Sequence, residues 1–230
     1  MGFQQQADDI DQCLFIHKEW DINMCVHVDD CLLDFSNIKN VEKMLKILKE
    51  RKFDYTESEK FTKALGIRVE ENENSITLSQ PNYVKIMLKD FELENCIEFD
   101  APPTQWESER SEDEESFDEG TYRSIIGCLA YLARMTRPDI EMYVFHLATF
   151  VANPGVKHWN AVVKLMGYLK KFPNYGISFK NLEEGNLWEF HVDADWAGCP
   201  STRKSTTGYI IRFMGGPLIT VSRRQKNVTL

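Results

Sequence analysis

The chain has 230 residues, of which 43% are hydrophobic, enough apolar material for a core in one or two domains. No apolar run approaches the roughly 20 residues needed to cross a bilayer, and the first residues lack the basic-then-apolar order of a signal peptide. This composition excludes a disordered chain and an integral membrane protein. We expect a soluble intracellular protein, cytoplasmic or nuclear, with no membrane partner.

The net charge of −9 is unevenly distributed. Residues 107–119 hold eight acidic residues and one arginine, a net charge of −7 that leaves −2 for everything else. Because like charges repel, we expect this stretch to be a solvated linker that does not pack. From residue 203 onward there are six basic residues and no acid. Five of these are candidate phosphate contacts, with solvated strand edges as the alternative: Arg203, Lys204, Arg223, Arg224 and Lys226.

Neither the cysteines nor the histidines are spaced like metal ligands. The six cysteines include no CxxC pair and are expected to be reduced, structural thiols: Cys13, Cys25, Cys31, Cys96, Cys128 and Cys199. Four histidines share no zinc-ligand spacing and are expected to pack or to cap: His17, His146, His158 and His191. The sequence therefore predicts neither a disulfide framework nor a zinc site.

The first hundred residues alternate hairpins with helices. In CVHVDDCLLDF, residues 25–35, apolar runs flank two adjacent aspartates, which predicts a β-hairpin with Asp29 and Asp30 at its tip. The apolar spacing in 37–53 predicts a helix, with Ser36 or Asn37 as its N-cap. The remaining elements are expected in this order: a strand at 61–70, a turn, a strand at 75–80 and a helix at 81–91 that begins with proline.

The linker that divides the chain into two regions begins at APPT, residues 101–104, and the pattern of apolar residues changes after it. Three helical stretches follow, separated at TRPD and NPGV, where proline can open a new helix but not continue an old one. The spacing of the apolar residues then becomes typical of β-strands, and the strands are separated by turns that contain glycine or proline. A three-stranded meander is predicted in the segments 187–196, 207–213 and 217–230.

Asp29, Asp30 and Asp193 lie on or near strands, where a carboxylate is either a turn cap or a metal ligand. Adjacent strand residues point to opposite faces, so Asp29 and Asp30 cannot chelate one ion symmetrically, although at a turn one can bind metal while the other supports it. Such oxygen ligands suit Mg²⁺, which takes one or two carboxylates together with substrate phosphates and water. Two such ions can clamp the attacking and leaving oxygens of a phosphoryl displacement. The residue pattern alone leaves the cap and the ligand both open.

Several motifs, in one order, resemble the copia-type retrotransposon Pol polyprotein. GFQQQADDIDQCLFI and HVDD are similar to the segment around the polymerase hairpin, and FTKALGIRV and ITLSQPNYVKIMLKDF to the palm edge and thumb entry that follow. YRSIIGCLAYLARMTRPDI, HWNAVVKLMGYLK, DADWAGCPSTRKSTTGYI and GGPLITVSRRQKNVTL continue the match. The resemblance covers nearly the whole chain and implies the second half of a reverse transcriptase followed by the start of its RNase H.

By this resemblance, Asp29 and Asp30 are the polymerase carboxylate pair that helps hold Mg²⁺, and Asp193 is the first metal-binding carboxylate of an RNase H site. The implied partners are an RNA/DNA template-primer and the remainder of the Pol polyprotein. The family's first polymerase aspartate lies upstream of this sequence and its RNase H glutamate downstream, so both sites are expected to be incomplete. His27 departs from the aromatic or aliphatic residue that usually precedes Val-Asp-Asp.

The expected fold class is α+β: a partial reverse-transcriptase palm hairpin with thumb- and connection-like helices, followed by an incomplete RNase H-like antiparallel meander. The first functional hypothesis is a segment of a magnesium-dependent RNA-directed DNA polymerase and RNase H. The alternatives are a non-enzymatic remnant or domesticated fragment that at most binds nucleic acid, and a protein-interaction module that exposes an apolar palm face. The expected regions are the palm and thumb entry (1–100), an acidic linker (101–120), connection-like helices (121–180) and RNase H-like strands (181–230).

Overall fold

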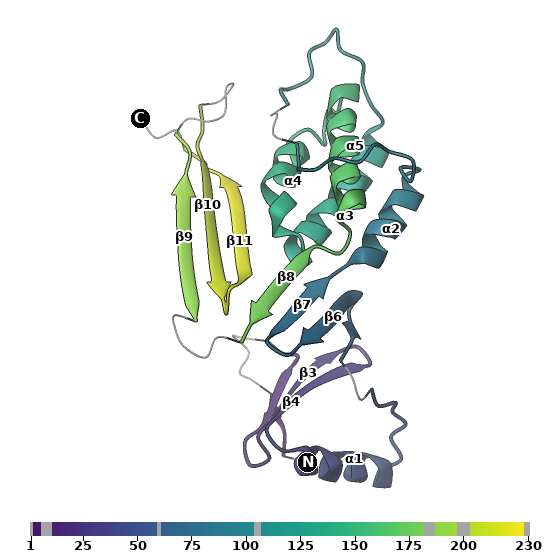
Figure 1. Cartoon of the computed structure of the whole chain (residues 1–230), viewed down its shortest axis with the longest axis vertical. Helices are drawn as coiled ribbons and strands as arrows, with labels where there is room; N and C mark the ends of the chain where they lie inside the picture. Colours follow the sequence, from purple (N-terminus) through teal and green to yellow (C-terminus); the bar gives the residue numbers. More distant parts are fainter. Residues whose placement is uncertain are drawn as a thin grey trace. The chain divides into compact units, whose positions relative to one another are not determined.

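The computed structural model describes residues 2–5, 11–58, 61–103, 107–181, 187–196 and 203–227. In these ranges the chain is mixed α+β, with three antiparallel sheets and five α-helices, so the expected fold class is confirmed at that level. Its contacts divide it into two compact units, Met1–Glu59 and Lys60–Leu230 (Figure 1). The boundaries expected at residues 100, 120 and 180 stay a prediction. No helix in the described ranges has both the length and the apolar character needed to cross a membrane.

The first unit is a four-stranded antiparallel sheet with one helix. The predicted hairpin is confirmed as its last two strands, and two strands that the sequence did not predict precede it. The helix begins after Asn37, whose side chain accepts a hydrogen bond from the Lys39 backbone N–H at 3.0 Å, satisfying one unpaired donor of the first turn. The elements are β1 (Gln4–Gln5), β2 (Leu14–His17), β3 (Ile22–His27), β4 (Asp30–Phe35) and α1 (Ile38–Glu50).

A small apolar core joins this sheet to α1. Ile22 on β3 is fully buried and clusters with Val41 and Met44 of α1. Leu33 of β4 packs against the same cluster, because the antiparallel register aligns β3 and β4 so that their apolar residues share one face. Side chains alternate along a strand, so His27, at an odd position of β3, lies on the face turned away from this core.

A second sheet joins segments that are far apart in the sequence. The strand expected at 61–70 is interrupted at Leu65 and Gly66, which have φ values of 50° and 80°, so it forms two strands instead of one. The sequence did not predict the last strand, which pairs with β7 although their hydrogen-bonded hydroxyls, Thr77 Oγ1 and Ser178 Oγ at 3.1 Å, are 101 residues apart. The sheet order is β5 (Lys63–Ala64), β6 (Ile67–Asn72), β7 (Ser75–Ser79) and β8 (Gly176–Lys180).

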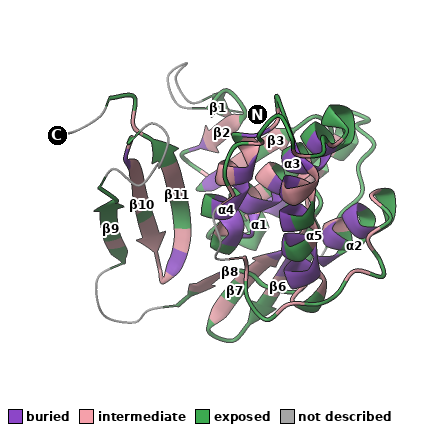
Figure 2. Cartoon of the chain, turned by 90° about the horizontal axis from the view of Figure 1, so that it is seen from above, coloured by how far each residue is buried: buried purple, intermediate pink, exposed green. Residues whose placement is uncertain are grey.

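The predicted helices are confirmed, and they form the main core of the second unit. Their buried apolar residues include Leu129 of α3, Val144 of α4 and Leu165 of α5, and Figure 2 shows buried residues gathered on these helices. Gly167 of α5 admits a neighbouring segment, because a Cβ there would lie 2.0 Å from the Ile97 carbonyl oxygen. The helices are α2 (Pro81–Asp90), α3 (Glu119–Met135), the 3₁₀ turn η1 (Pro138–Ile140), α4 (Glu141–Ala148) and α5 (Val156–Lys171).

The predicted meander is confirmed as β9 (Trp188–Ala194), β10 (Thr206–Phe213) and β11 (Gly216–Arg224), in that spatial order. β9 lies at one edge of this sheet, and nearly all of it is exposed (Figure 2). Phe190 and Val192 are 67% and 77% exposed. One face of this small sheet therefore presents apolar side chains to solvent.

The acidic stretch is not a free linker, and the expectation that it cannot pack is wrong. Lys157 Nζ forms an ion pair with Glu114 at 2.8 Å, and the Arg110 guanidinium donates to Asn153 Oδ1 at 2.7 and 3.0 Å. The Nε2–H groups of His146 and His158 donate to the carbonyl oxygens of Glu107 and Ser108, at 3.0 and 2.8 Å. Lys157 and the two imidazoles on α4 and α5, together with the Asn153 amide between these helices, thus hold the segment in place.

Arg137, in the predicted break between α3 and α4, is a buried cation in contact with a carboxylate, a carbonyl oxygen and two aromatic rings. Its side chain is 1% exposed and forms two hydrogen bonds to the Asp139 carboxylate, at 2.8 and 2.9 Å. A third bond, at 2.9 Å, goes to the carbonyl oxygen of Phe172 at the end of α5. The guanidinium also lies 5.2 Å from the Tyr168 ring centre and 5.6 Å from that of Tyr175. Planar bidentate pairing of this kind is specific to arginine.

We predict that Arg137→Met lowers the free energy of unfolding by about 3 kcal/mol or more, because it leaves the partners of a buried charge unpaired. Urea denaturation followed by circular dichroism measures this change. The control is Arg123→Met, which removes an exposed i,i+4 pair with Glu119 and should cost less than about 0.5 kcal/mol. Equal losses in the two variants would contradict the structural role of Arg137.

We also predict that the chain loses stability as the pH falls below about 6.5. Burial lowers the pKa of His158 below its ordinary value, and the Ser108 carbonyl opposes this only in part. The folded state therefore disfavours the charged imidazole, whereas the unfolded chain takes up the proton readily, so stability is complete above about pH 6.5 and declines below it. Thermal melts across this range test the prediction. His158→Gln should flatten the pH dependence, and the exposed His27→Gln variant serves as the control; identical pH profiles for wild type and His158→Gln would refute it.

Candidate metal and nucleic-acid site

The paired aspartates lie where the sequence predicted, at the tip of the β3–β4 hairpin. Val28 and Asp29 form the two-residue turn, and Asp30 begins β4 opposite His27. Val28 has φ = 55°, and such turns require positive φ at one or both central residues. A β-branched residue is poorly suited to that conformation, so the turn is strained directly before the first aspartate.

Both tip carboxylates are accessible from solvent. Asp29 and Asp30 are exposed, and Asp30 shares with His27 the sheet face turned away from the α1 core. Within the described ranges, no three His, Cys, Asp or Glu side chains are grouped as metal ligands. Two carboxylates fit part of the Mg²⁺ requirement, because this ion keeps waters and takes its remaining ligands from phosphates. The tip can therefore supply two oxygen donors but needs further ligands from elsewhere.

Asp193 lies at a second place, beside a cleft in the second unit. It is exposed on β9 opposite Gly208, and its Oδ1 accepts a hydrogen bond from the Ala194 N–H at 2.8 Å. The cleft has a volume of about 240 Å³ and lies between α4 and the meander. Asp195 also lines it and accepts a hydrogen bond from the Thr206 backbone N–H. The structure thus adds a second acidic residue to Asp193 that the sequence analysis did not single out.

The five predicted basic residues gather at one end of the meander. The register pairs Thr206 with Arg224 and Thr207 with Arg223, and the Gln225 N–H donates to the Ser205 carbonyl at 2.7 Å. Residues 203–204, just before β10, and 223–226, at the end of β11, therefore lie together. Among the ion pairs of the described residues, none involves Arg203, Lys204, Arg223, Arg224 or Lys226. The two arginines on β11 are adjacent and therefore point to opposite faces.

The cysteines depart in part from expectation. All five in the described ranges are free thiols, but Cys13, Cys25 and Cys31 are exposed rather than part of a core. Although Cys31 is exposed, neighbouring atoms displace part of the water around its sulfur, and this desolvation is the main reason that the pKa of the thiol is raised. The nearby Asp30 carboxylate and Cys25 raise it further. This thiol beside the hairpin tip is therefore held in its protonated, less reactive form. Cys199 lies outside the described residues.

The histidines mostly behave as expected. His158 is fully buried, stacks on Phe150 with ring centres 4.1 Å apart, and accepts the Gly155 N–H at the start of α5 at 2.9 Å. His17 is buried and stacks on Trp20. His191 differs, because it is exposed and lies 3.3 Å from the Glu189 carboxylate. Packing is thus confirmed for His17 and His158 and wrong for His191.

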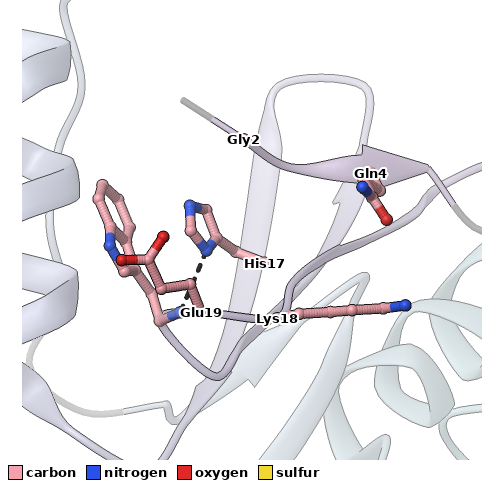
Figure 3. Close-up of a pocket in the computed structure, with 6 residues that line it drawn as sticks. Gly2, Gln4, His17, Lys18 and Glu19 are labelled. Atoms are coloured by element: carbon pink, nitrogen blue, oxygen red, sulfur yellow. Dashed lines mark hydrogen bonds between the residues drawn. The ribbon is translucent and has the colours of Figure 1, made fainter.

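No pattern in the sequence predicted the pocket in the first unit that Figure 3 shows. It has a volume of about 420 Å³ and is lined by Gly2, Gln4, His17, Lys18, Glu19 and Trp20. Its wall is fixed by the hydrogen bond from the Trp20 N–H to His17 Nδ1 at 3.1 Å (Figure 3). Neither Asp29 nor Asp30 lines this pocket, so it is separate from the candidate metal ligands.

Comparison with known proteins gives consistent matches along the chain. The family model for reverse transcriptase (RNA-dependent DNA polymerase) matches residues 1–105. The retrovirus-related Pol polyprotein from transposon RE2 of Arabidopsis thaliana is 31% identical over 99% of this chain, and that from transposon TNT 1-94 of Nicotiana tabacum is 28% identical over 96%. This chain spans 16% and 17% of those two polyproteins, about a sixth of their length.

A shorter relative matches only part of the sequence. Secreted RxLR effector protein 161 of Plasmopara viticola is 36% identical over 47% of this chain and 76% of its own length. No solved structure matches the chain.

We predict that Val28→Asn raises the free energy of unfolding by up to about 1 kcal/mol, because asparagine tolerates the left-handed conformation that valine resists. Chemical denaturation measures the gain. Val28→Ile keeps the branched Cβ and should give no gain. If the two variants unfold at the same denaturant concentration, the hairpin tip is not strained by the residue at position 28.

Proposed function

Because the chain belongs to the copia-type retrotransposon Pol polyproteins, we propose that it acts as part of an RNA-directed DNA polymerase and its RNase H. Its substrate would be an RNA/DNA template-primer, and its remaining partners would come from the other five sixths of such a polyprotein. The observation that carries this proposal is the pair of exposed carboxylates at a hairpin tip, Asp29 and Asp30, inside the segment that matches the polymerase model.

In this proposal the hairpin places the two carboxylates beside the reacting phosphate. Asp29 and Asp30 would hold Mg²⁺ together with a carboxylate from outside this chain, and magnesium supplies charge neutralisation at the transferred phosphoryl group. The short turn restricts the carboxylates to one small region, so the protein contributes position rather than covalent chemistry. His27, opposite Asp30, would line the same face and contact the primer end.

We further propose that Asp193 begins an RNase H site. Its support is the cleft in which Asp193 and Asp195 lie close to the basic end of the meander. Paired carboxylates suit a divalent ion that activates water, and basic residues suit the phosphates of a hybrid. The 2′-hydroxyls of the RNA strand would distinguish the substrate from DNA.

A second function is favoured by the gathering of Arg203, Lys204 and 223–226 at one end of a sheet. A fragment that only binds nucleic acid would need this cluster and neither carboxylate site. Such binding would be independent of sequence and would weaken steeply with salt, because each neutralised phosphate releases counterions. It would also be insensitive to the removal of magnesium.

The test is primer extension by a chimera in which this chain replaces its equivalent in the transposon RE2 polyprotein, with the parent polyprotein assayed beside it. Asp29→Asn and Asp30→Asn should each abolish magnesium-dependent extension, because a neutral amide is a poor ligand for a hard cation. Asp34→Asn is the matched control, since Asp34 lies on the same hairpin and its Oδ2 accepts a hydrogen bond from Asn23 Nδ2 at 3.0 Å.

The RNase H proposal has a separate readout in the same chimera. Asp193→Asn should stop cleavage of the RNA strand while primer extension continues, and Glu189→Gln on the same strand is the control. Full activity in all the aspartate variants would overturn the enzymatic proposal. If, in addition, the isolated chain binds nucleic acid without magnesium and loses that binding on charge reversal at Arg223 and Lys226, the binding-only function holds.

A further inference from the structure

Helix α4 has apolar or aromatic residues on two sides, which sets it apart from an ordinary surface helix. Tyr143, Val144 and Leu147 are buried in the core of the second unit. Met142, Phe145, His146 and Thr149, spaced at i, i+3, i+4 and i+7, form a second stripe that lines the cleft opposite the meander. A helix that is apolar on both sides needs a neighbour on both sides. The meander supplies the neighbour on this second side, since α4 is in contact with β11, and the cleft is the space left between them.

The opposite wall of the cleft is formed mainly by residues that lie side by side on the three strands of the meander. Asp193, Gly208 and Ser222 are aligned by the strand register and share one face of the sheet. The next row contributes Thr206 and Arg224, which are paired across β10 and β11. Gly208 carries no side chain, so the floor stays open between the carboxylate of Asp193 and the hydroxyl of Ser222. This wall thus presents acid, hydroxyl and guanidinium groups side by side.

Arg224 is exposed, and it lies on the face of the sheet that is turned toward α4. Arg224 lines the cleft together with His146 of α4. Burial lowers the pKa of His146, and the positive charge of Arg224 lowers it further. His146 is itself positioned by its bond to the Glu107 carbonyl at 3.0 Å. Arg223, the adjacent residue, points to the opposite face. One arginine of the basic cluster is therefore directed into the cleft and the other away from it.

We propose that this cleft holds a single nucleotide of a bound nucleic-acid strand, with its phosphate on Arg224 and its sugar or base against Phe145. The proposal rests on the proposed function, which it deepens by adding the wall of α4 to the site at Asp193. An arginine side chain can donate two parallel hydrogen bonds to the oxygens of one phosphate. Bases and sugars can pack against an aromatic ring whatever the nucleotide sequence. The volume of about 240 Å³ is too small for both strands, so only one strand of a hybrid would enter the cleft.

A divalent cation should strengthen this binding. Asp193 and Asp195 repel a bare phosphate, and a magnesium ion between the carboxylates and the phosphate would reverse that repulsion. Arg134 adds a further positive charge on the helical side, with its guanidinium 5.4 Å from the centre of the Phe145 ring. Phe145 and Arg224 are thus positioning residues that would hold the strand in register with the carboxylates.

The test uses the whole 230-residue chain and a short fluorescent RNA–DNA hybrid, with magnesium present and absent. Arg224→Ala should weaken binding in magnesium about tenfold, the usual effect of losing a charged hydrogen bond. Arg223→Ala, on the same strand and the opposite face, should weaken it less, and Arg224→Lys should recover only part of the affinity. Phe145→Leu keeps the apolar volume but removes the ring, and should weaken binding while Phe190→Ala, on the far face of the meander, does not.

A second readout locates the contact directly. A hybrid that carries a photoreactive uridine should crosslink to the peptide that contains Phe145, and thermal melts will show whether each variant is folded. Equal effects of Arg223→Ala and Arg224→Ala, with crosslinks only outside α4, would overturn the inference and leave the proposed function standing. No binding of the hybrid by the wild-type chain in magnesium would instead count against the RNase H proposal itself, and the inference would fall with it.

Discussion

The arrangement of the second unit depends on one buried cation, Arg137. Its guanidinium joins the break between α3 and α4 to the carbonyl oxygen of Phe172 at the end of α5, and Asp139 neutralises the charge. Tyr168 reinforces the pair through a hydrogen bond from its hydroxyl to Asp139 at 2.8 Å. Because the α3–α4 break sets the direction of α4, this cluster also sets the direction of the stripe that lines the Asp193 cleft. A polar interaction in the core therefore orients a candidate binding surface elsewhere in the unit.

Charge segregation explains how an acidic chain can suit a nucleic-acid partner. The most acidic stretch is held against α4 and α5 by His146, Lys157 and His158, so its negative charge is partly neutralised and fixed in place. The basic residues of the meander gather at one end instead of being spread along the strands. A local cluster of positive charge attracts phosphates even when the sum of charges is negative. His146 contacts the acidic stretch and also lines the cleft, so it is a structural link between the two.

The sequence predicted those elements whose signals are local. The hairpin tip at Asp29 and Asp30, the caps and prolines that start α1 and α2, and the meander all follow from patterns within about ten residues. β8 was missed because its partner, β7, is about a hundred residues away and its own five residues carry only a weak alternation. The packing of the acidic stretch was missed because charge repulsion was weighed without the cations on α4 and α5. The cleft was missed because Phe145 and Asp193 are far apart in the sequence and line the same cleft only in the folded chain. Asp193 itself was singled out because it lies among apolar residues in a predicted strand.

The pairing of β7 with β8 also has a consequence for synthesis on the ribosome. β7 is made early, but its partner follows only after α2 to α5 have been translated, about a hundred residues later. At roughly 5 to 20 residues per second, β7 waits on the order of 5 to 20 seconds with one edge unpaired. During that interval the exposed backbone donors and acceptors can pair with another nascent chain, which is the usual hazard of a late-closing sheet. The helices between the two strands have local contacts and can form first, so they provide the surface on which the sheet closes.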